Sequence, residues 1–330
     1  MNAIFSLLAV LVLVAVSGIG VESLGLKSLF GIIIPYLAIV IFLAGFIIRV
    51  LKWAKSPVPF RIPTTCGQQK TLPWIKQNKL DNPYTGWAVI GRMLLEVLFF
   101  RSLFRNTKQE LKEGPKLVYG SNKYLWLGGL VFHWSFLIIF IRHFRFFSDP
   151  VPWGINLLEK IDSFFQIGLP IVYLTDAAVL AAVTYLLFRR LMDSKLRYIS
   201  LASDYFPLFL IMGIALTGVW MRYFQKVDII SVKTLSLGLF TFHPVIPEGI
   251  SFWFFVHIFL VSVLIAYFPM SKLMHMGGVF LSPTRNLANN SRAKRHINPW
   301  NPTVKLHTYE EWEDEFREKM REAGMPLEKE

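Results

Sequence analysis

The sequence predicts an all-α, polytopic transmembrane helix bundle. Its 330 residues are 54% hydrophobic and only 17% charged, and the mean hydropathy is +0.45. Soluble chains of this length carry more charge. Several apolar runs reach the roughly 20 residues that cross a bilayer core. The net charge of +13 is what Lys and Arg collected in cytoplasmic loops produce, so it gives no reason to expect nucleic-acid binding.

Six apolar runs have the length of spans, at residues 3–21, 30–51, 124–144, 168–188, 205–223 and 250–270. The first run lacks the basic start and the cleavage site of a signal peptide, so we interpret it as a retained helix. The expected fold therefore has six transmembrane helices.

A basic insertion separates the second and third spans. Residues 52–123 hold thirteen Lys/Arg against four Asp/Glu, and the 189–204 loop holds four against two. The 142–166 loop holds three of each. This bias places both termini, the insertion and the tail in the cytoplasm. Within the insertion, the apolar stretch 87–100 is short and contains Arg92 and Glu96, which predicts an interfacial or docking helix and not a span.

The chain then divides into five parts: residues 1–29 (extra helix and outer loop), 30–52 (a transmembrane helix), 53–123 (cytoplasmic insertion), 124–278 (the remaining four spans) and 279–330 (cytoplasmic tail). In the tail, Thr308 and Glu311 fit a capping box for a helix over 308–323. Its apolar stripe of Trp312, Phe316 and Met320 is expected to pack on a cytoplasmic subunit, or on the chain's own loops.

Four of the seven histidines are candidates for metal ligands. His133 and His143 lie in the third span, His257 lies in the sixth, and His275 lies at or past the inner end of the sixth. Imidazole is a standard axial ligand of haem iron, and two such ligands suit electron transfer. The single Cys66 excludes an internal disulfide, a Cys-ligated iron–sulfur cluster and covalent C-x-x-C-H haem within this chain.

The spacing of these histidines predicts two pairs. Ten helical positions advance roughly 15 Å along the axis. Eighteen advance roughly 27 Å and complete about five full turns, so His257 and His275 share a face if the helix continues past Pro269. Opposite helix directions pair His143 with His257 (the outer pair) and His133 with His275 (the inner pair). The two vertical gaps are unequal. We expect each pair to bind one haem b, with Met274 and Met276 as alternative ligands at the inner site; polar contacts between helices are the competing interpretation.

The His-x9-His and His-x17-His pattern resembles the membrane cytochrome b (gamma) subunit of respiratory nitrate reductase, over residues 30–278. In that family the outer histidines bind the haem distal to the cytoplasm. The resemblance implies that His143 and His257 hold the distal haem, and that His133 and His275 hold the proximal one. The resemblance also implies a five-helix dihaem core, from which this chain departs by one extra N-terminal helix, its insertion and its longer tail.

The segment 57–69, PVPFRIPTTCGQQ, resembles DsrM. DsrM is the cytochrome b subunit of the DsrMKJOP complex of dissimilatory sulfur metabolism, and this resemblance covers the whole chain. It implies a DsrK-like cytoplasmic iron–sulfur subunit, further membrane and periplasmic subunits, and electron delivery toward a DsrC-type thiol protein. It also implies menaquinone as the membrane carrier. An alternative is a nitrate- or heterodisulfide-reductase-type complex, and a different class is a haem-free scaffold or transporter.

A quinol site near the outer pair needs a proton acceptor and a polar anchor. The candidates are His143, Lys160, Asp162 and Asp176, although Asp176 is equally expected as an ion pair between helices. Arg142 is a candidate partner for haem propionates, with interface anchoring as the alternative. His243 is expected at the surface, and Cys66 is expected to be inert.

Overall fold

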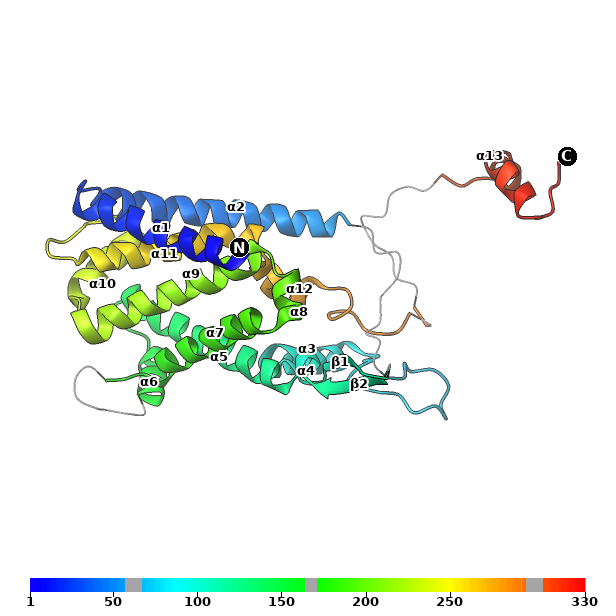
Figure 1. Cartoon of the computed structure of the whole chain (residues 1–330), viewed down its shortest axis with the longest axis horizontal. Coiled ribbons are helices and arrows are strands. Elements are labelled where there is room, and N and C mark those ends of the chain that lie inside the picture. The colour runs from blue at the N-terminus through cyan, green and yellow to red at the C-terminus, as the bar shows by residue number, and fades with distance from the viewer. Residues whose placement is uncertain (57–66, 115, 164–170, 292, 295–304, 330) are drawn as a thin grey trace.

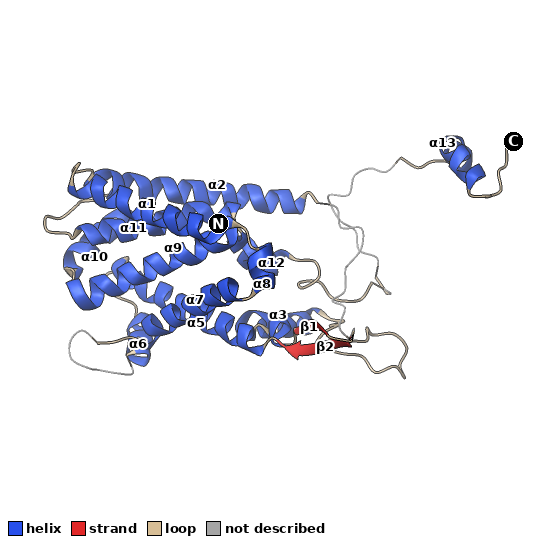
Figure 2. Cartoon of the chain, in the orientation of Figure 1, coloured by secondary structure: helices blue, strands red, loops and turns tan. Residues whose placement is uncertain are grey.

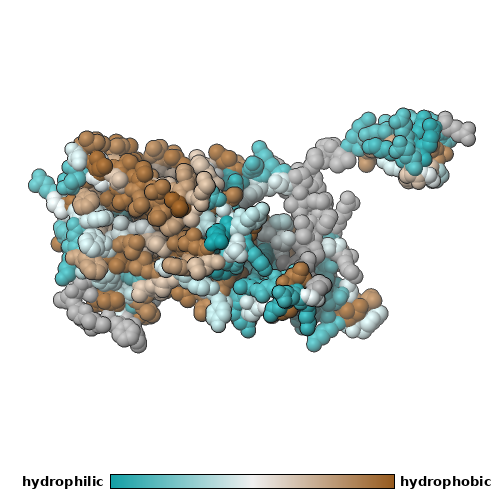
Figure 3. Space-filling model, viewed as in Figure 1, coloured by the Kyte–Doolittle hydropathy of each residue, from teal (hydrophilic) through white to brown (hydrophobic). Residues whose placement is uncertain are grey.

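The computed structural model describes residues 1–56, 67–114, 116–163, 171–291, 293–294 and 305–329. The described residues form helices and one two-stranded hairpin, as Figure 2 shows. The predicted all-α bundle is therefore confirmed. Exposed apolar side chains cover α1 and α2, while polar residues gather at the ends of the bundle and on α13 (Figure 3). This band is what a bilayer requires of a spanning protein.

Six long helices run along one axis (Figure 1): α1 (Asn2–Glu22), α2 (Ile34–Ala54), α5 (Lys123–His143), α7 (Leu174–Met192), α9 (Ala202–Val219) and α11 (Phe252–Tyr267). Short π-helical turns extend α2 and α9, at Leu29–Ile33 and Trp220–Gln225. Short 3₁₀ turns extend α5 and α11, at Phe144–Phe146 and Phe268–Met270. With these turns, five helices of the described chain are long and apolar enough to cross a membrane.

The exception is α7, which corresponds to the span expected at 168–188. It begins at Leu174, and residues 168–170 lie outside the described part of the chain. It carries Asp176 in its first turn and Arg189 and Arg190 in its last. Because α7 nevertheless packs against α5 and α9, it belongs to the bundle; six spans in the bilayer stays a prediction.

The helices approach closely where small residues lie between them. A Cβ added at Gly128 of α5 would lie 2.5 Å from the ring of Tyr185 on α7. One added at Gly31 would lie 2.8 Å from the ring of Phe255, which is fully buried on α11. Packing of this kind holds membrane helices together, because lipid supplies no hydrophobic drive between them.

The sixth span does not continue as a helix to His275. Helix α11 ends at Tyr267, two 3₁₀ turns follow at Phe268–Met270 and Lys272–Met274, and α12 (His275–Leu281) begins at the histidine. Pro269 has no N–H to donate and its ring crowds the preceding turn. The condition for a shared face of His257 and His275 is therefore not met.

Three shorter helices connect the spans: α6 (Trp153–Asp162), α8 (Ser194–Ile199) and α10 (Ile229–Phe240). The sequence predicted only loops there. The Asp228 side chain caps α10 by accepting from the backbone N–H groups of Ile230 and Ser231. We call the end of the bundle with α6 and α10 the α10 end. His243 is exposed there, as expected.

The insertion folds at the opposite end, where α2 ends and α5 begins, which we call the insertion end. It contains α3 (Gly86–Phe99), α4 (Arg101–Phe104) and an antiparallel hairpin of β1 (Thr107–Lys112) and β2 (Lys116–Ser121). Helix α3 confirms the helix predicted over 87–100. The hairpin was not predicted, because its strands are short and exposed and show no buried face.

The tail helix α13 (Tyr309–Glu322) has the predicted capping box of Thr308 and Glu311. It stands apart from the bundle (Figure 1). Glu313 is buried and accepts hydrogen bonds from the backbone N–H groups of Glu328 and Lys329, at 2.7 and 3.0 Å. Met320 is buried as well. The tail thus packs in part on its own last residues.

Candidate functional site

The outer pair joins α5 to α11 toward the α10 end. The ring centroids of His143 and His257 are 6.4 Å apart, and their planes differ by 12°. His143 is the last residue of α5, and His257 lies in the second turn of α11. Both positions lie within continuous helix, so the backbone fixes them firmly.

The inner pair lies toward the insertion end. The ring centroids of His133 and His275 are 5.9 Å apart, with planes at 84°. His133 sits in the middle of α5, whereas His275 is the first residue of α12, after the break in the sixth span. The sequence predicted unequal axial distances between His133 and His143 and between His257 and His275, on the assumption of regular helices. The chain between Tyr267 and His275 is not a regular α-helix, so that prediction does not apply to the sixth span.

Both separations fit two imidazoles on one metal ion. A metal–imidazole bond of about 2 Å, with the ring centre about 1 Å beyond the nitrogen, puts two such centres roughly 6 Å apart. Among the described residues no group of three or more His, Cys, Asp and Glu side chains is placed to hold a metal ion. Haem needs only two protein ligands, since its ring supplies four nitrogens, and each pair offers two imidazoles at a matching separation.

The second ring nitrogen of each histidine is already engaged. The Nδ1 atoms of His133, His143 and His275 lie 2.7, 2.7 and 2.9 Å from the carbonyl oxygens of Gly129, Ile139 and Lys272. A carbonyl can only accept, so these Nδ1 atoms carry the proton. The Nε2 atoms are then unprotonated, as ligation requires, and the hydrogen bonds orient the rings.

His257 reaches the same state through a side chain. Its Nδ1 lies 2.9 Å from the Thr217 hydroxyl on α9. That hydroxyl lies 2.9 and 3.0 Å from the carbonyl oxygens of Gly213 and Ile214, which take its single proton, so toward His257 it accepts. Thr217 therefore sets the tautomer of His257.

A buried ionic network adjoins the outer pair. Arg142, next to His143, is 7% exposed, and it pairs with Asp162 at 3.1 Å and Asp176 at 2.6 Å. Asp162 also caps the start of α7, accepting from the N–H and hydroxyl of Thr175 at 2.9 and 2.6 Å. Arg142 thus faces the protein interior and joins α5, α6 and α7.

The network continues to α9 through two tyrosines. The Tyr223 hydroxyl donates to Asp176 at 2.8 Å and accepts from the backbone N–H of Tyr173 at 3.0 Å. The guanidinium groups of Arg142 and Arg222 lie over the Tyr173 ring, at 3.7 and 4.0 Å from its centroid. Two arginines and two carboxylates make the group close to neutral, which suits burial.

The remaining sequence candidates lie elsewhere. Lys160 is exposed on α6, and no contact among the described residues joins its amine to this network. Met274 is 2% exposed, whereas Met276 is 51% exposed. Cys66 lies outside the described residues.

The inner pair borders the insertion. The Phe100 ring meets His133 edge-on, with centroids 4.9 Å apart. Nearby, Asp81 pairs with Arg101 at 2.5 Å and Arg105 at 2.6 Å. Burial raises the pKa of Asp81, but hydrogen bonds and charge from the two arginines outweigh it and hold this pKa below the ordinary carboxyl value.

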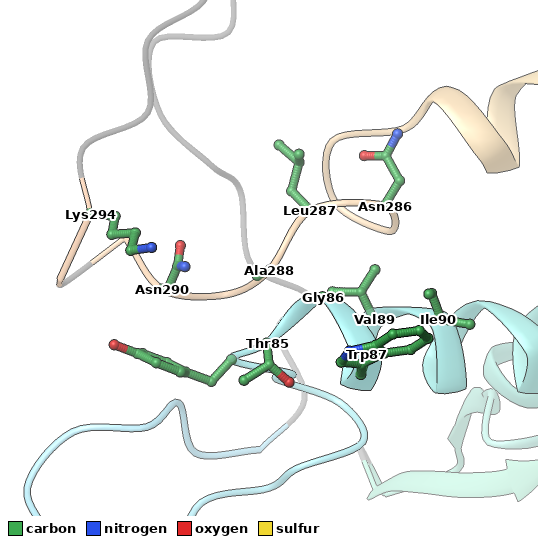
Figure 4. A pocket seen from close by; sticks show the side chains of 11 residues that line it. Thr85, Gly86, Trp87, Val89, Ile90, Asn286, Leu287, Ala288, Asn290 and Lys294 are labelled. Atoms are coloured by element: carbon green, nitrogen blue, oxygen red, sulfur yellow. The ribbon is translucent and has the colours of Figure 1, made fainter.

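A surface hollow of about 800 Å³ opens at the start of α3 (Figure 4). It lies between α3 and residues 286–290, with Trp87, Ile90 and Leu287 in its walls and Lys294 at its edge. None of the four histidines lines it, so this hollow is separate from both pairs.

The sequence analysis did not identify five residues of the site, namely Thr217, Tyr173, Tyr223, Arg222 and Phe100. Tyr223 and Arg222 carried a usable signal, because polar side chains inside a span mark function or pairing. Thr217 and Phe100 carried none, since their roles depend on which helices are neighbours.

A helix bundle with two histidine pairs at different depths has the architecture of a membrane cytochrome b. The chain belongs to the nitrate reductase gamma subunit family, whose model matches residues 87–293. This confirms the predicted resemblance, although the match begins at residue 87 and not at 30.

Two relatives extend the likeness over most of the chain. A protein of Archaeoglobus fulgidus named "Hdr-like menaquinol oxidoreductase cytochrome b-like subunit" is 48% identical over 281 residues, 83% of this chain and 84% of the relative. A protein of the same name from Archaeoglobus profundus is 40% identical over 280 residues, 83% of each chain. The chain is accordingly a multi-pass membrane protein of this family.

Proposed function

We propose that this chain oxidises menaquinol near its outer pair and passes the electrons to a cytoplasmic iron–sulfur subunit. Menaquinol gives up two electrons and two protons and becomes menaquinone. The single observation that carries the proposal is the stacking of two histidine pairs between α5 and the sixth span, each with its Nδ1 atoms engaged. One haem b at each pair would supply reversible one-electron chemistry at iron.

The direction of transfer follows from the predicted orientation. The basic insertion and the 189–204 loop place the insertion end in the cytoplasm, at the cytoplasmic membrane, with both termini on that side. The outer pair then faces the other side, where quinol protons leave. The inner pair, His133 and His275, lies toward the cytoplasmic side and borders the insertion at Phe100.

The network beside His143 supplies the groups that quinol oxidation needs. We propose that Asp176 accepts a quinol proton and that Arg142 holds this carboxylate in place. The 2.6 Å pair and the 2.8 Å hydrogen bond from Tyr223 fix Asp176 at the α10 end. Lys160, exposed on α6, is proposed as the polar anchor at the entrance.

The partner is proposed from the relatives' names and the segment 57–69. Both relatives are called Hdr-like, which favours a partner resembling the iron–sulfur subunit of heterodisulfide reductase. We propose a DsrK-like subunit, within a DsrMKJOP-type complex of dissimilatory sulfur metabolism. Co-purification of this subunit, identified by mass spectrometry, separates it from a nitrate-reductase-type partner.

The test is a redox titration of the purified protein with and without a menaquinol-site inhibitor. We expect two b haems per chain and an inhibitor that shifts the potential of one of them. Asp176→Asn should slow reduction by a menaquinol analogue, whereas Asp228→Asn, an exposed cap of α10, should not. A colourless protein, or haems that the analogue does not reduce, would refute the proposal.

A further inference from the structure

Helix α3 has its charged side chains on the inside and its apolar side chains on the outside. Arg92 is 4% exposed and donates to the carbonyl oxygens of Leu287 at 3.1 Å and Asp81 at 3.3 Å. Glu96 pairs with Arg285 at 2.9 Å. This arrangement is the reverse of a helix on a soluble domain, whose charges face water.

The outward face of α3 is an uncharged stripe. Trp87, Ile90, Leu94 and Leu98 follow one another at intervals of three and four residues, and they are 85, 50, 53 and 36% exposed. Every charged residue between 86 and 99 faces inward. In water such a stripe would be unfavourable, at roughly 25 cal/mol for each Å² of apolar surface.

The end of α3 lies beside a membrane-spanning helix. The indole N–H groups of Trp126 and Trp134, on α5, donate to the carbonyl oxygens of Phe99 at 2.7 Å and Leu98 at 3.0 Å. These carbonyls belong to the last turn of α3 and have no partner within the helix. Side-chain donors satisfy them where water does not.

The depth of this end follows from the geometry of α5. His133, which the Phe100 ring contacts, lies ten residues from the start of α5, or about 15 Å along its axis. Phe100 itself adopts the left-handed conformation (φ 51°) and reverses the chain into α4. The chain then returns to the β1–β2 hairpin, where Lys108, Glu110 and Lys112 are exposed.

We propose that α3 and the turn at Phe100 are half-inserted in the membrane, with the stripe of α3 in contact with lipid acyl chains. Arg101 and Arg105, which pair with Asp81, lie outside this lipid contact. Leu94 and Leu98 lie at acyl-chain depth, and Trp87 lies at headgroup level, where tryptophan is favoured. The stripe continues the lipid-facing surface of α5, on which Leu127 and Leu137 are 49 and 44% exposed.

The amino-acid composition of the stripe favours lipid over a protein subunit as the surface that it contacts. Protein interfaces carry a polar rim and about one hydrogen bond per 100–200 Å², and this stripe offers no side-chain donor or acceptor except the Trp87 indole. At its water end the stripe meets the hollow of Figure 4, where Lys294 lies at the edge. A cation there suits an anionic headgroup.

The inserted end of α3 lies against the inner pair. The Phe100 ring meets His133 edge-on, while His133 itself stays partly exposed. This proposal rests on the membrane fold and not on the proposed electron transfer, and its test requires no haem signal.

The test uses single cysteines in the full chain, with Cys66→Ser as background, in the assembled complex in nanodiscs. Leu94→Cys and Leu98→Cys carry a fluorophore that doxyl-labelled phosphatidylcholine quenches. Leu137→Cys is the lipid control and Leu111→Cys, 73% exposed on β1, is the water control. We expect quenching at 94 and 98 within about twofold of that at 137. Alkylation by a charged maleimide should be at least about tenfold slower than at 111, since the reactive thiolate is disfavoured in hydrocarbon.

Two results would overturn the proposal. Rapid alkylation at 94 and 98, as at 111, would place the stripe in water. Resistance to both the lipid quencher and the maleimide would mean that a protein subunit covers it.

Discussion

The two histidine pairs are built differently, although each joins α5 to the sixth span. The outer pair sits in continuous helix, with near-parallel rings and buried ion pairs beside it. The inner pair depends on a break in the sixth span, has near-perpendicular rings, and borders ion pairs whose arginines are 24 and 44% exposed. The outer site is therefore held by long helices of the bundle, and the inner site by a broken sixth span and by contact with Phe100.

The largest effect is expected at the outer network. Arg142→Met leaves Asp162 and Asp176 buried without their ion-pair partner, which should lower the free energy of unfolding by about 3–5 kcal/mol. Arg145→Met, which breaks a partly exposed pair with Glu159, should lower it by at most about 1 kcal/mol. Denaturant unfolding in detergent measures both. Equal losses would mean that the outer pair is not held by buried charge.

The next effect concerns the orientation of His257. Thr217→Val keeps the shape but removes the acceptor of the His257 Nδ1–H, so haem should be held about 10–100-fold less tightly at the outer pair only. Transfer of haem to an excess of a scavenging globin reports this. Thr234→Val, on α10, should not change the rate. Loss of haem from the inner pair instead of the outer pair would contradict the assignment of Thr217 and His257 to the outer site.

A smaller effect is expected at the inner site. Asp81→Asn removes two partly exposed ion pairs and should loosen the insertion by about 1 kcal/mol at pH 7. Because the folded pKa of Asp81 is lowered, its stabilisation is present above the ordinary carboxyl pKa of about 3.9 and is lost as pH falls through the folded value.

Limited proteolysis of the insertion checks this prediction. The Asp81→Asn variant should be cut faster than wild type at pH 7, but not by an acid-active protease well below pH 4. Glu113→Gln, at the exposed turn of the hairpin, is the control. A difference that persists in acid would show that ion pairing is not the cause.

The last prediction involves no change in stability. The imidazole planes of the two pairs differ by 12° and 84°. With a haem bound at each pair, they would give two distinct low-spin ferric signals in electron paramagnetic resonance, the inner one more anisotropic. His257→Ala should remove the less anisotropic signal. Two indistinguishable signals would contradict the difference in ring geometry.

The sequence predicted the bundle well, because long apolar runs and the short Arg-containing helix at 87–100 depend on local composition. It missed α6, α8, α10 and the β-hairpin: α10 and the strands lack a clear periodicity, and α6 and α8 are short. Of the site, the histidine positions followed from spacing. The interruption at Pro269 was visible, but its effect on the reach of His275 was not. Thr217 and the partners of Arg142 depend on which helices are neighbours, which one sequence does not contain.

The most direct test of the account is the number of haems in three matched variants. Purified wild-type protein should bind two b haems per chain by the pyridine haemochrome assay. His257→Ala and His275→Ala should each bind one, and His243→Ala, at an exposed loop position, should bind two. Wild-type protein without haem, or both pair variants with two, would contradict the assignment of the two histidine pairs.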